Sequence, residues 1–257
     1  YFHMIKRHDL YIYFTALFGG LGVMENIKNR LEHFEGPVIA DQVFTDYQGF
    51  PLGLDLKEMP QRTQIVMEGL IEVLPANLYQ KALAGNNHGI PEGSLQTEKE
   101  YYKDAGDLDQ YLKERHKRKV AELQTYCDRN EVWFEQEISQ EVVDYVKSNQ
   151  EILSAVRQGS LLFVTKIPYD GIRYLQTKDK TMKSYYACHC PFARESILSE
   201  ESNVDPDWCY CSAGFAKFPF EVILGQELEV KVLQSALAGD VVCRFAIDLP
   251  EGFEVKD

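Results

Sequence analysis

The spacing of the cysteines constrains this chain more than any other feature of its sequence. Four of the six cysteines fall in two Cys-x-Cys pairs, Cys188 with Cys190 and Cys209 with Cys211, and a fifth follows at Cys243. Six cysteines in 257 residues are too few for a disulfide-dense secreted scaffold. Tight pairs in a reducing compartment indicate metal or thiol chemistry instead. We therefore expect a cytoplasmic protein whose paired thiols share one site.

Composition excludes several classes of partner. A hydrophobic content of 45% is enough to bury a sizeable core. The formal net charge of −13 argues against nucleic acid and against an anionic membrane surface, because both bind clustered Lys and Arg. The basic run at 113–119 lies among acidic residues, which is typical of a solvated helix face. The apolar stretch at 10–24 is too short to span a bilayer. Neither nucleic acid nor a membrane is an expected partner.

The pattern of apolar residues changes near Gly159. Residues 1–3 resemble an expression-tag remnant ahead of Met4, residues 4–158 show mostly helical periodicity, and residues 159–257 contain strand-like segments. No linker separates the two regions, so we expect one continuous α+β structure, with a mostly helical part packed on an antiparallel sheet and its helices. Helices are expected at 23–34, 63–84 (with Pro75 inside), 109–128, 138–146, 152–156 and 206–224 (broken near Pro219), and strands at 160–166, 183–188, 228–233 and 241–249.

Local geometry suggests which thiols can meet. On a strand at 183–190, Cys188 and Cys190 would point to the same face, because side chains alternate. Asp205-Pro206 fits a helix start, which places Cys209 near the positive end of that helix and should lower the pKa of its thiol. Cys211 would then point about 200° away from Cys209. Cys243 falls on the apolar, inner face of the last strand.

These thiols predict a zinc site. Zinc prefers four tetrahedral ligands, and a complete set would be Cys188, Cys190, Cys209 and Cys243. Two other readings of the cysteines stay open: a catalytic or redox thiol, and inert buried side chains. The sixth cysteine, Cys127, falls on the apolar face of a predicted helix and should pack as a small hydrophobe.

The sequence from 205 to 249 resembles the 4-vinyl reductase domain. The resemblance rests on the helix that carries Cys209 with Gly214-Phe215, on a glycine ahead of a strand, and on the turn at Gly239-Asp240 that leads to Cys243-Arg-Phe. It implies helices packed on an antiparallel sheet and a binding site for small, often hydrophobic or aromatic molecules.

The same resemblance bears on the metal. In the aromatic-sensing members of that family, zinc is held by cysteines that match Cys209 and Cys243, with a further Cys and a Glu between them. Here those two positions are Ser235 and Val232. The additional Cys-x-Cys pair upstream would replace the missing ligands.

A second resemblance, of the CHCP and CYC segments, is to bacterial proteins related to the amino-thiazoline-carboxylic acid hydrolase family. It implies a hydrolase in which a thiolate or a zinc-bound water opens a small heterocycle or amide. Arg194 could then bind a substrate carboxylate, although a surface arginine paired with an acid such as Glu195 is the simpler expectation.

Two functions therefore compete: a small-molecule-binding protein with a structural zinc, and a zinc- or cysteine-dependent hydrolase. A closed four-cysteine site favours the first, and an open zinc position the second. An assembly role and a homodimer are further expectations. His88, in a turn-rich loop at 86–93, is expected to be an exposed turn residue. The residues expected to line a pocket are His189, Arg194, Tyr210, Cys211 and Phe215.

Overall fold

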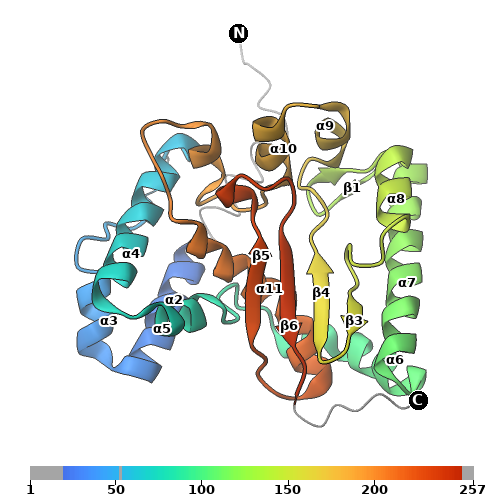
Figure 1. Ribbon diagram of the computed structural model, residues 1–257, viewed down its shortest axis with the longest axis horizontal. Coiled ribbons are helices and arrows are strands. Elements are labelled where there is room, and N and C mark those ends of the chain that lie inside the picture. The colour runs from blue at the N-terminus through green and yellow to red at the C-terminus, as the bar shows by residue number, and fades with distance from the viewer. Residues whose placement is uncertain (1–19, 52–53, 251–257) are drawn as a thin grey trace.

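A computed structural model describes residues 20–51 and 54–250. The expected tag remnant and most of the apolar stretch at 10–24 lie outside these ranges. The fold is α+β, as predicted, with a four-stranded antiparallel sheet of order β3-β4-β6-β5 at its centre (Figure 1). The strands of this sheet are β3 (Val156–Gln158), β4 (Leu161–Thr165), β5 (Val230–Gln234) and β6 (Arg244–Asp248), and a small hairpin joins β1 (Val132–Trp133) to β2 (Gln136–Glu137).

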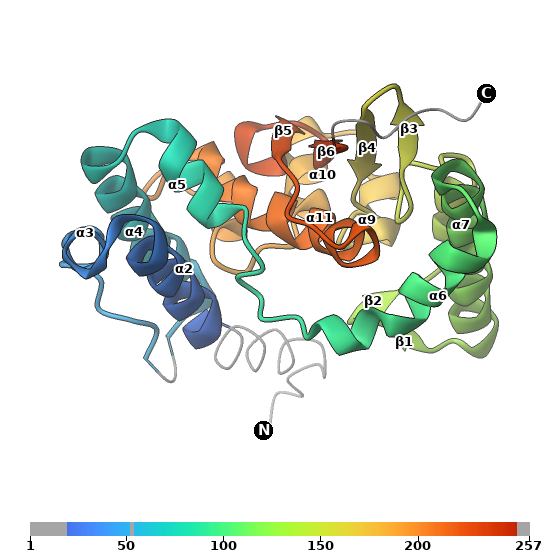
Figure 2. The same ribbon diagram turned by 90° about the horizontal axis from the view of Figure 1, so that it is seen from below.

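Helices surround the sheet in three groups. The first group lies beyond the β5 edge, the second beyond the β3 edge, and the third covers one face of the sheet (Figures 1 and 2). The first group is α2 (Gly20–Glu35), α3 (Pro37–Val43), α4 (Met59–Val73) and α5 (Ala76–Leu83), the second is α6 (Gln96–Ala105), α7 (Leu108–Arg129) and α8 (Gln140–Lys147), and the third is α9 (Gly171–Gln176), α10 (Lys180–Ala187) and α11 (Tyr210–Leu224).

The core forms three hydrophobic clusters. One is built from the first helix group, a second lies between the sheet and α11, and a third lies around α7 and α8. Cys211 belongs to the first cluster, Cys188 and Cys243 belong to the second, and Cys190 packs against both. Most of the cysteines therefore lie where the first helix group meets the sheet and α11. Cys127 packs against the third cluster.

Helix α11 joins the first two of these clusters. It is apolar on most of its surface, and a buried lysine, Lys217, ties it to the segment ahead of β5: its ammonium donates to Glu221 and to the Leu228 carbonyl (2.7 Å). The helix ends at Gly225, which has a φ of 73° and adopts the left-handed conformation that glycine tolerates best.

The structure contradicts the strand expected at 183–188. That segment belongs to α10, because the Asp179 side chain caps the helix by accepting from the Met182 N–H at 2.8 Å. The helix ends at Ala187, and Cys188 is its extended C-cap residue. The pairing of Cys188 with Cys190 therefore comes from a loop rather than from strand alternation.

Three other predicted elements also differ. The helix expected at 63–84 is two helices, since Leu74 is extended ahead of Pro75 and Pro75 is the N-cap of α5. No helix forms at 152–156, where Ile152 bridges Thr165 and β3 begins at Val156. The segment 206–209 is a short 3-10 turn, and α11 starts at Tyr210 and continues through Pro219.

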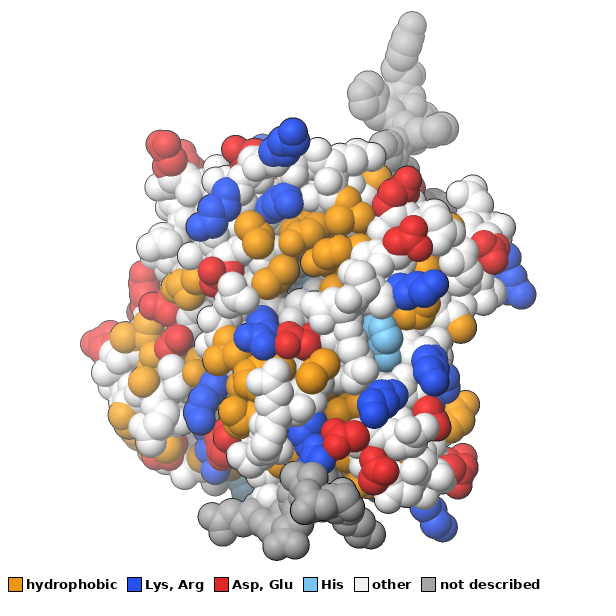
Figure 3. Space-filling model, turned by 45° about the vertical axis from the view of Figure 1, so that its right-hand side comes forward, with side chains coloured by type: hydrophobic (Ala, Val, Ile, Leu, Met, Phe, Trp, Pro, Cys, Tyr) orange, Lys and Arg blue, Asp and Glu red, His pale blue; other side chains and the backbone are white. Residues whose placement is uncertain are grey.

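No helix within the described ranges is long and apolar enough to cross a membrane. On the face shown in Figure 3, acidic and basic side chains are interspersed and neither sign forms a continuous patch.

Candidate metal-thiolate site

The four cysteines expected to bind zinc come from three separate parts of the fold. Cys188 and Cys190 lie in the loop after α10, Cys209 ends the 3-10 turn Pro206–Cys209 and is the N-cap of α11, and Cys243 precedes β6. Cys188, Cys209 and Cys243 are buried, and Cys190 is partly buried. Cys188 and Cys243 are more than fifty positions apart in the sequence, yet they are close enough to influence each other electrostatically, and both also influence Cys209.

The sulfur of Cys190 has polar neighbours. The indole Nε1 of Trp208 donates to Cys190 Sγ at 3.3 Å, and the backbone N–H groups of Phe192 and Ala193 also act on the pKa of this thiol. Burial raises the pKa of this thiol, whereas all three donors favour its thiolate form and oppose that increase.

Neighbouring polar groups also act on the other three thiols. The backbone N–H of Cys190 lowers the pKa of Cys188, and the backbone N–H of Ala236 lowers the pKa of Cys243, although burial raises both. The hydroxyl of Ser235 acts in the same direction on the pKa of Cys209. Donors aimed at a thiol sulfur stabilise a thiolate, because they supply positive charge where the negative charge develops.

The low thiol pKa predicted for Cys209 is wrong. Burial raises the pKa of this thiol well above its usual value, and the neighbouring Cys243 and Cys188 raise it further. The loss of water at this buried position raises the thiol pKa by more than the helix N-terminus lowers it. For the same reason the pKa of the Cys188 thiol lies far above its ordinary value, with burial as the main cause and Cys190 and Cys243 adding to it.

The donor chemistry of these four thiols suits zinc, but their side chains do not form a coordination sphere. Within residues 20–51 and 54–250, no group of three or more His, Cys, Asp or Glu side chains is arranged to hold a metal ion. The thiols are electrostatic neighbours rather than converging ligands. Binding a metal would require rotation of these side chains toward a common point.

The other cysteine of the second pair, Cys211, faces a histidine. Its Sγ lies 3.6 Å from Nε2 of His88, and the His88 ring packs edge-on against Phe215 with ring centroids 5.2 Å apart. The expectation of a simple exposed turn histidine is therefore incomplete: His88 is exposed as a residue, but its Nε2 edge is turned toward a buried thiol.

A glycine allows this contact. A Cβ on Gly214, one turn after Cys211, would lie 2.5 Å from the Gly85 carbonyl oxygen, so only a glycine lets the loop after α5 approach α11. Asn87 then fixes the loop. Its side chain donates to the carbonyls of Ala82 (3.1 Å) and Leu83 (2.7 Å).

A lysine lies close to both groups of thiols. Lys166, directly after β4, donates from Nζ to Ser212 Oγ at 3.0 Å. Loss of water, with a smaller contribution from the positive charge of Lys166, lowers the pKa of His88 to about 4. His88 is therefore neutral at physiological pH, with a lone pair available on one ring nitrogen.

His189 and Arg194 form a separate polar layer. His189 lies in a loop, not on a strand face, and its Nε2 is 2.6 Å from the Ile167 carbonyl oxygen. Arg194 is not a surface residue: its side chain is only 14% exposed and lies over the rings of Tyr169 and Tyr185, 5.0 Å from each centroid. Its Nε lies 3.5 Å from Oε1 of Glu195, so the expected pairing of this arginine with an acid is confirmed.

The two aromatic residues expected in the pocket point to different places. Tyr210 packs against two core clusters. Phe215 is 42% exposed, and its ring contacts both the His88 ring and the Lys166 ammonium. The five expected pocket residues thus contact different neighbours.

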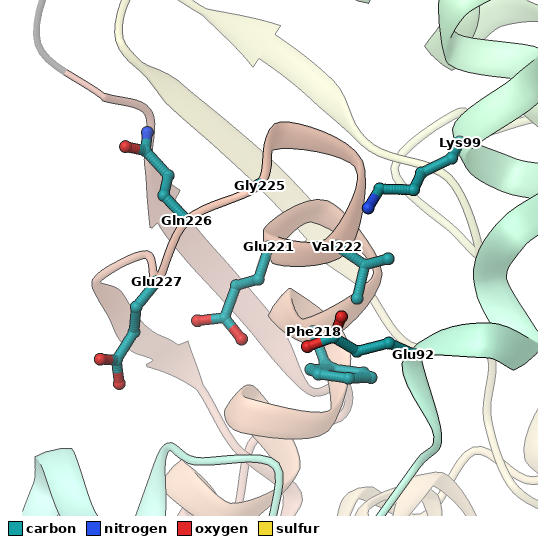
Figure 4. A pocket seen from close by; sticks show the side chains of 8 residues that line it. All are labelled: Glu92, Lys99, Phe218, Glu221, Val222, Gly225, Gln226 and Glu227. Atoms are coloured by element: carbon teal, nitrogen blue, oxygen red, sulfur yellow. The ribbon is translucent and has the colours of Figure 1, made fainter.

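An open depression of about 400 Å³ lies instead at the far end of α11 (Figure 4). It is lined by Glu92, Lys99, Phe218, Glu221, Val222, Gly225, Gln226 and Glu227. Two of its carboxylates already stabilise the fold, because Glu221 pairs with Lys217 and Glu227 pairs with Arg30 at 3.1 Å. At 1.5 Å per helical residue, Val222 lies about 20 Å along the helix from Cys209. The depression is separate from the thiols.

The sequence did not predict contacts of three residues with the thiols. Lys166, Trp208 and Ser235 all contact or influence the thiols, and none belongs to a cysteine motif. Trp208 is next to Cys209 in the sequence, and Ser235 stands at a ligand position of the 4-vinyl reductase domain, so the sequence drew attention to both. Lys166 had none, since only the tertiary fold brings the end of β4 to α11.

Comparison with known proteins gives one match, in the C-terminal part of the chain. No curated protein and no solved structure matches this sequence. Residues 169–252 match the model of a family of unknown function, DUF6144, and this segment contains Cys188, Cys190, Cys209, Cys211 and Cys243 but excludes His88 and Lys166.

Proposed function

We propose that this protein binds a zinc ion through Cys188, Cys190, Cys209 and Cys243, and that the surrounding fold binds a small hydrophobic or aromatic molecule. The observation that carries the metal part is that Trp208 Nε1 donates to Cys190 Sγ at 3.3 Å and that neighbouring N–H or O–H groups lower the pKa of all four thiols, against the effect of burial. A reducing cytoplasm would keep these thiols free to bind metal.

The physical argument is one of charge. Donors to sulfur favour thiolates, whereas burial opposes them strongly, and the neighbouring thiols would repel each other once ionised. A divalent cation among them resolves this conflict, because the metal supplies the missing positive charge. Zinc is the cation that four thiolates in a closed tetrahedral site select best.

Metal binding in this proposal draws the four side chains together. They do not form a coordination sphere in the described part of the chain, so part of the binding free energy would be used to close the site. Such coupling between metal binding and local folding is usual for structural zinc. The metal would then join the loop after α10, the start of α11 and the entry to β6.

The small-molecule part rests on the resemblance to the 4-vinyl reductase domain. One contact supports that resemblance: Ser235, which stands where that family has a cysteine ligand, hydrogen bonds to Cys209, which stands where the family has another. Positions that would share a metal in the family are therefore neighbours in this chain.

A second candidate function, a thiol-dependent hydrolase, is favoured by the contact between Cys211 and His88. In such a reaction the Cys211 sulfur would bond to the carbonyl carbon of an amide as its C–N bond breaks, with the thiol proton passing by way of His88 Nε2 to the leaving amine; water would then cleave the thioester to release the acid and restore the thiol. The thiol is only 4% exposed, so we rank this function second. It requires Cys211, whereas the metal site does not.

Elemental analysis with a free-thiol count tests the proposal. Protein purified without added metal should contain about one zinc ion per chain, with four of its six thiols protected in the native state. Both measures should change together when the protein is unfolded in the presence of a chelator. Metal-free protein whose six thiols all react rapidly while folded would contradict the proposal.

A further inference from the structure

Lys166 is held against α11 and has no acidic partner there. Its backbone N–H donates to the Cys243 carbonyl at 2.9 Å, and its ammonium donates to Ser212 Oγ at 3.0 Å. Within residues 20–51 and 54–250, no carboxylate lies within 4.0 Å of this ammonium. An ammonium has three N–H donors, and the bond to Ser212 uses one of them.

An exposed aromatic ring lies beside this ammonium. Lys166 Nζ is 5.3 Å from the centroid of the Phe215 ring, and the lysine side chain is only half-buried. Phe215 is 42% exposed, whereas Phe218 and Phe220 on the same helix are buried. The exposed His88 packs edge-on against Phe215, with ring centroids 5.2 Å apart. A cation, an aromatic ring and an imidazole therefore meet where solvent can reach them.

This combination suits a small anion. A half-buried cation is more favourable with an opposite charge beside it than without one, because burial removes part of its hydration. Arg194, the residue that the sequence suggested for a ligand carboxylate, already pairs with Glu195 at 3.5 Å. Lys166 has no such acid, so it is the better placed of the two cations to bind a carboxylate from a ligand.

Phe215 indicates what the rest of the ligand is. Aromatic rings pack with their centroids about 4.5–7 Å apart. A ligand ring on the exposed side of Phe215 would thus bring a directly attached carboxylate within reach of Lys166 Nζ, 5.3 Å from the Phe215 centroid. The contact between rings is needed as well, because a protein with a net charge of −13 repels small anions at long range.

We propose that Lys166, Ser212 and Phe215 form a binding site for a small aromatic carboxylate; this inference rests on the small-molecule part of the proposed function and names its ligand class. Lys166 pairs with the carboxylate, Ser212 holds the ammonium in place, and Phe215 contacts the ring of the ligand. The site requires neither a metal ion nor an ionised thiol.

Titration with three probes tests this site. Benzoate has both the ring and the charge, benzyl alcohol has the ring without the charge, and acetate has the charge without the ring. Binding is followed by the ring C–H NMR signals of His88, which are identified by their loss in His88→Gln. The exposed His33 on α2 serves as the internal reference. Zinc content is measured separately on the same samples.

We expect benzoate to bind at least about 10-fold more tightly than benzyl alcohol or acetate, the scale of one charge-assisted hydrogen bond. Lys166→Met should abolish the preference over benzyl alcohol, Lys166→Arg should keep most of it, and Lys147→Met, at an exposed lysine of α8, should match the parent. Phe215→Leu should weaken benzoate binding by about 3-fold or more, because it removes the contact between rings. This second variant covers the case in which Lys166→Met does not fold.

Equal affinities of the parent for benzoate and benzyl alcohol would overturn the carboxylate site and leave the binding of aromatic molecules, and so the proposed function, intact. Benzoate affinity that is unchanged in both Lys166→Met and Phe215→Leu would also overturn it, because benzoate would then bind elsewhere. If no probe binds to a parent protein that contains zinc, the carboxylate site is refuted and the metal part of the proposed function stands. Zinc-free protein that binds benzoate through Lys166 would support the site and contradict the metal part alone.

Discussion

The thiols differ in their surroundings. Cys127 packs among apolar side chains of the third cluster, as its place in the helical pattern predicted. Cys190 is different, because an indole and two backbone N–H groups converge on its sulfur. Sequence spacing identifies which cysteines are close in the chain, but the donors to sulfur depend on tertiary contacts such as that of Trp208.

His88 leads to a prediction about pH. Its pKa falls from 6.5 to about 4 in the folded protein, so the unfolded chain binds a proton that the folded chain excludes. Stability should therefore be lost as the pH falls from 6.5 toward 4. His88→Gln should make this loss smaller, as followed by urea unfolding at a series of pH values.

Two comparisons complete that test. His189, whose pKa is lowered to about 3 mainly by burial, remains in the variant and should preserve part of the pH dependence. Replacement of the exposed His33 on α2 by Gln should leave the parent's pH dependence unchanged. If His88→Gln follows the same curve as the parent, the Nε2 edge of His88 is not buried against Cys211.

At the scale of elements, the helices with strong periodicity were predicted well, and the short elements were not. The helices expected at 23–34 and 109–128 correspond to α2 and α7. The segment 183–188 failed because its apolar residues fit either period, and the deciding signal was the Asp179 cap. The later start of α11 depended on a 3-10 turn that periodicity does not reveal.

The contact between α11 and the loop after α5 gives a prediction at this scale. Gly214→Ala would place a Cβ 2.5 Å from the Gly85 carbonyl oxygen, and backbone atoms cannot move aside cheaply. We expect a loss of about 1–3 kcal/mol in the free energy of unfolding, typical of overpacking, as measured by urea denaturation.

The matched control is Gly93→Ala, since a Cβ on Gly93 meets nothing within 4 Å. This variant should unfold at the same urea concentration as the parent. If Gly214→Ala is equally well tolerated, α11 and the loop after α5 are not packed as closely as described, and the contact between Cys211 and His88 loses its structural basis.

At the scale of the whole molecule, the fold class was predicted from the sequence, whereas the details of the site were predicted only in part. A helical region followed by strands indicates an α+β fold, and β3 from the first region pairs with β4 of the second. The pairing of Cys188 with Cys190 was argued from a strand that does not form, yet these thiols lie near enough to Cys209 and Cys243 to influence their pKa values or be influenced by them. The position of Lys166 against α11 could not be foreseen, since it depends on the tertiary fold.

The proposed zinc site is tested most directly by replacing each of the five clustered cysteines in turn with serine and measuring zinc content and thermal stability. Serine at Cys188, Cys190, Cys209 or Cys243 should reduce both, because a structural metal contributes free energy to folding. Cys211→Ser should keep its zinc, because Cys211 contacts His88 instead. Zinc that is lost from Cys211→Ser but retained in Cys243→Ser would contradict the account and place the metal between the two Cys-x-Cys pairs.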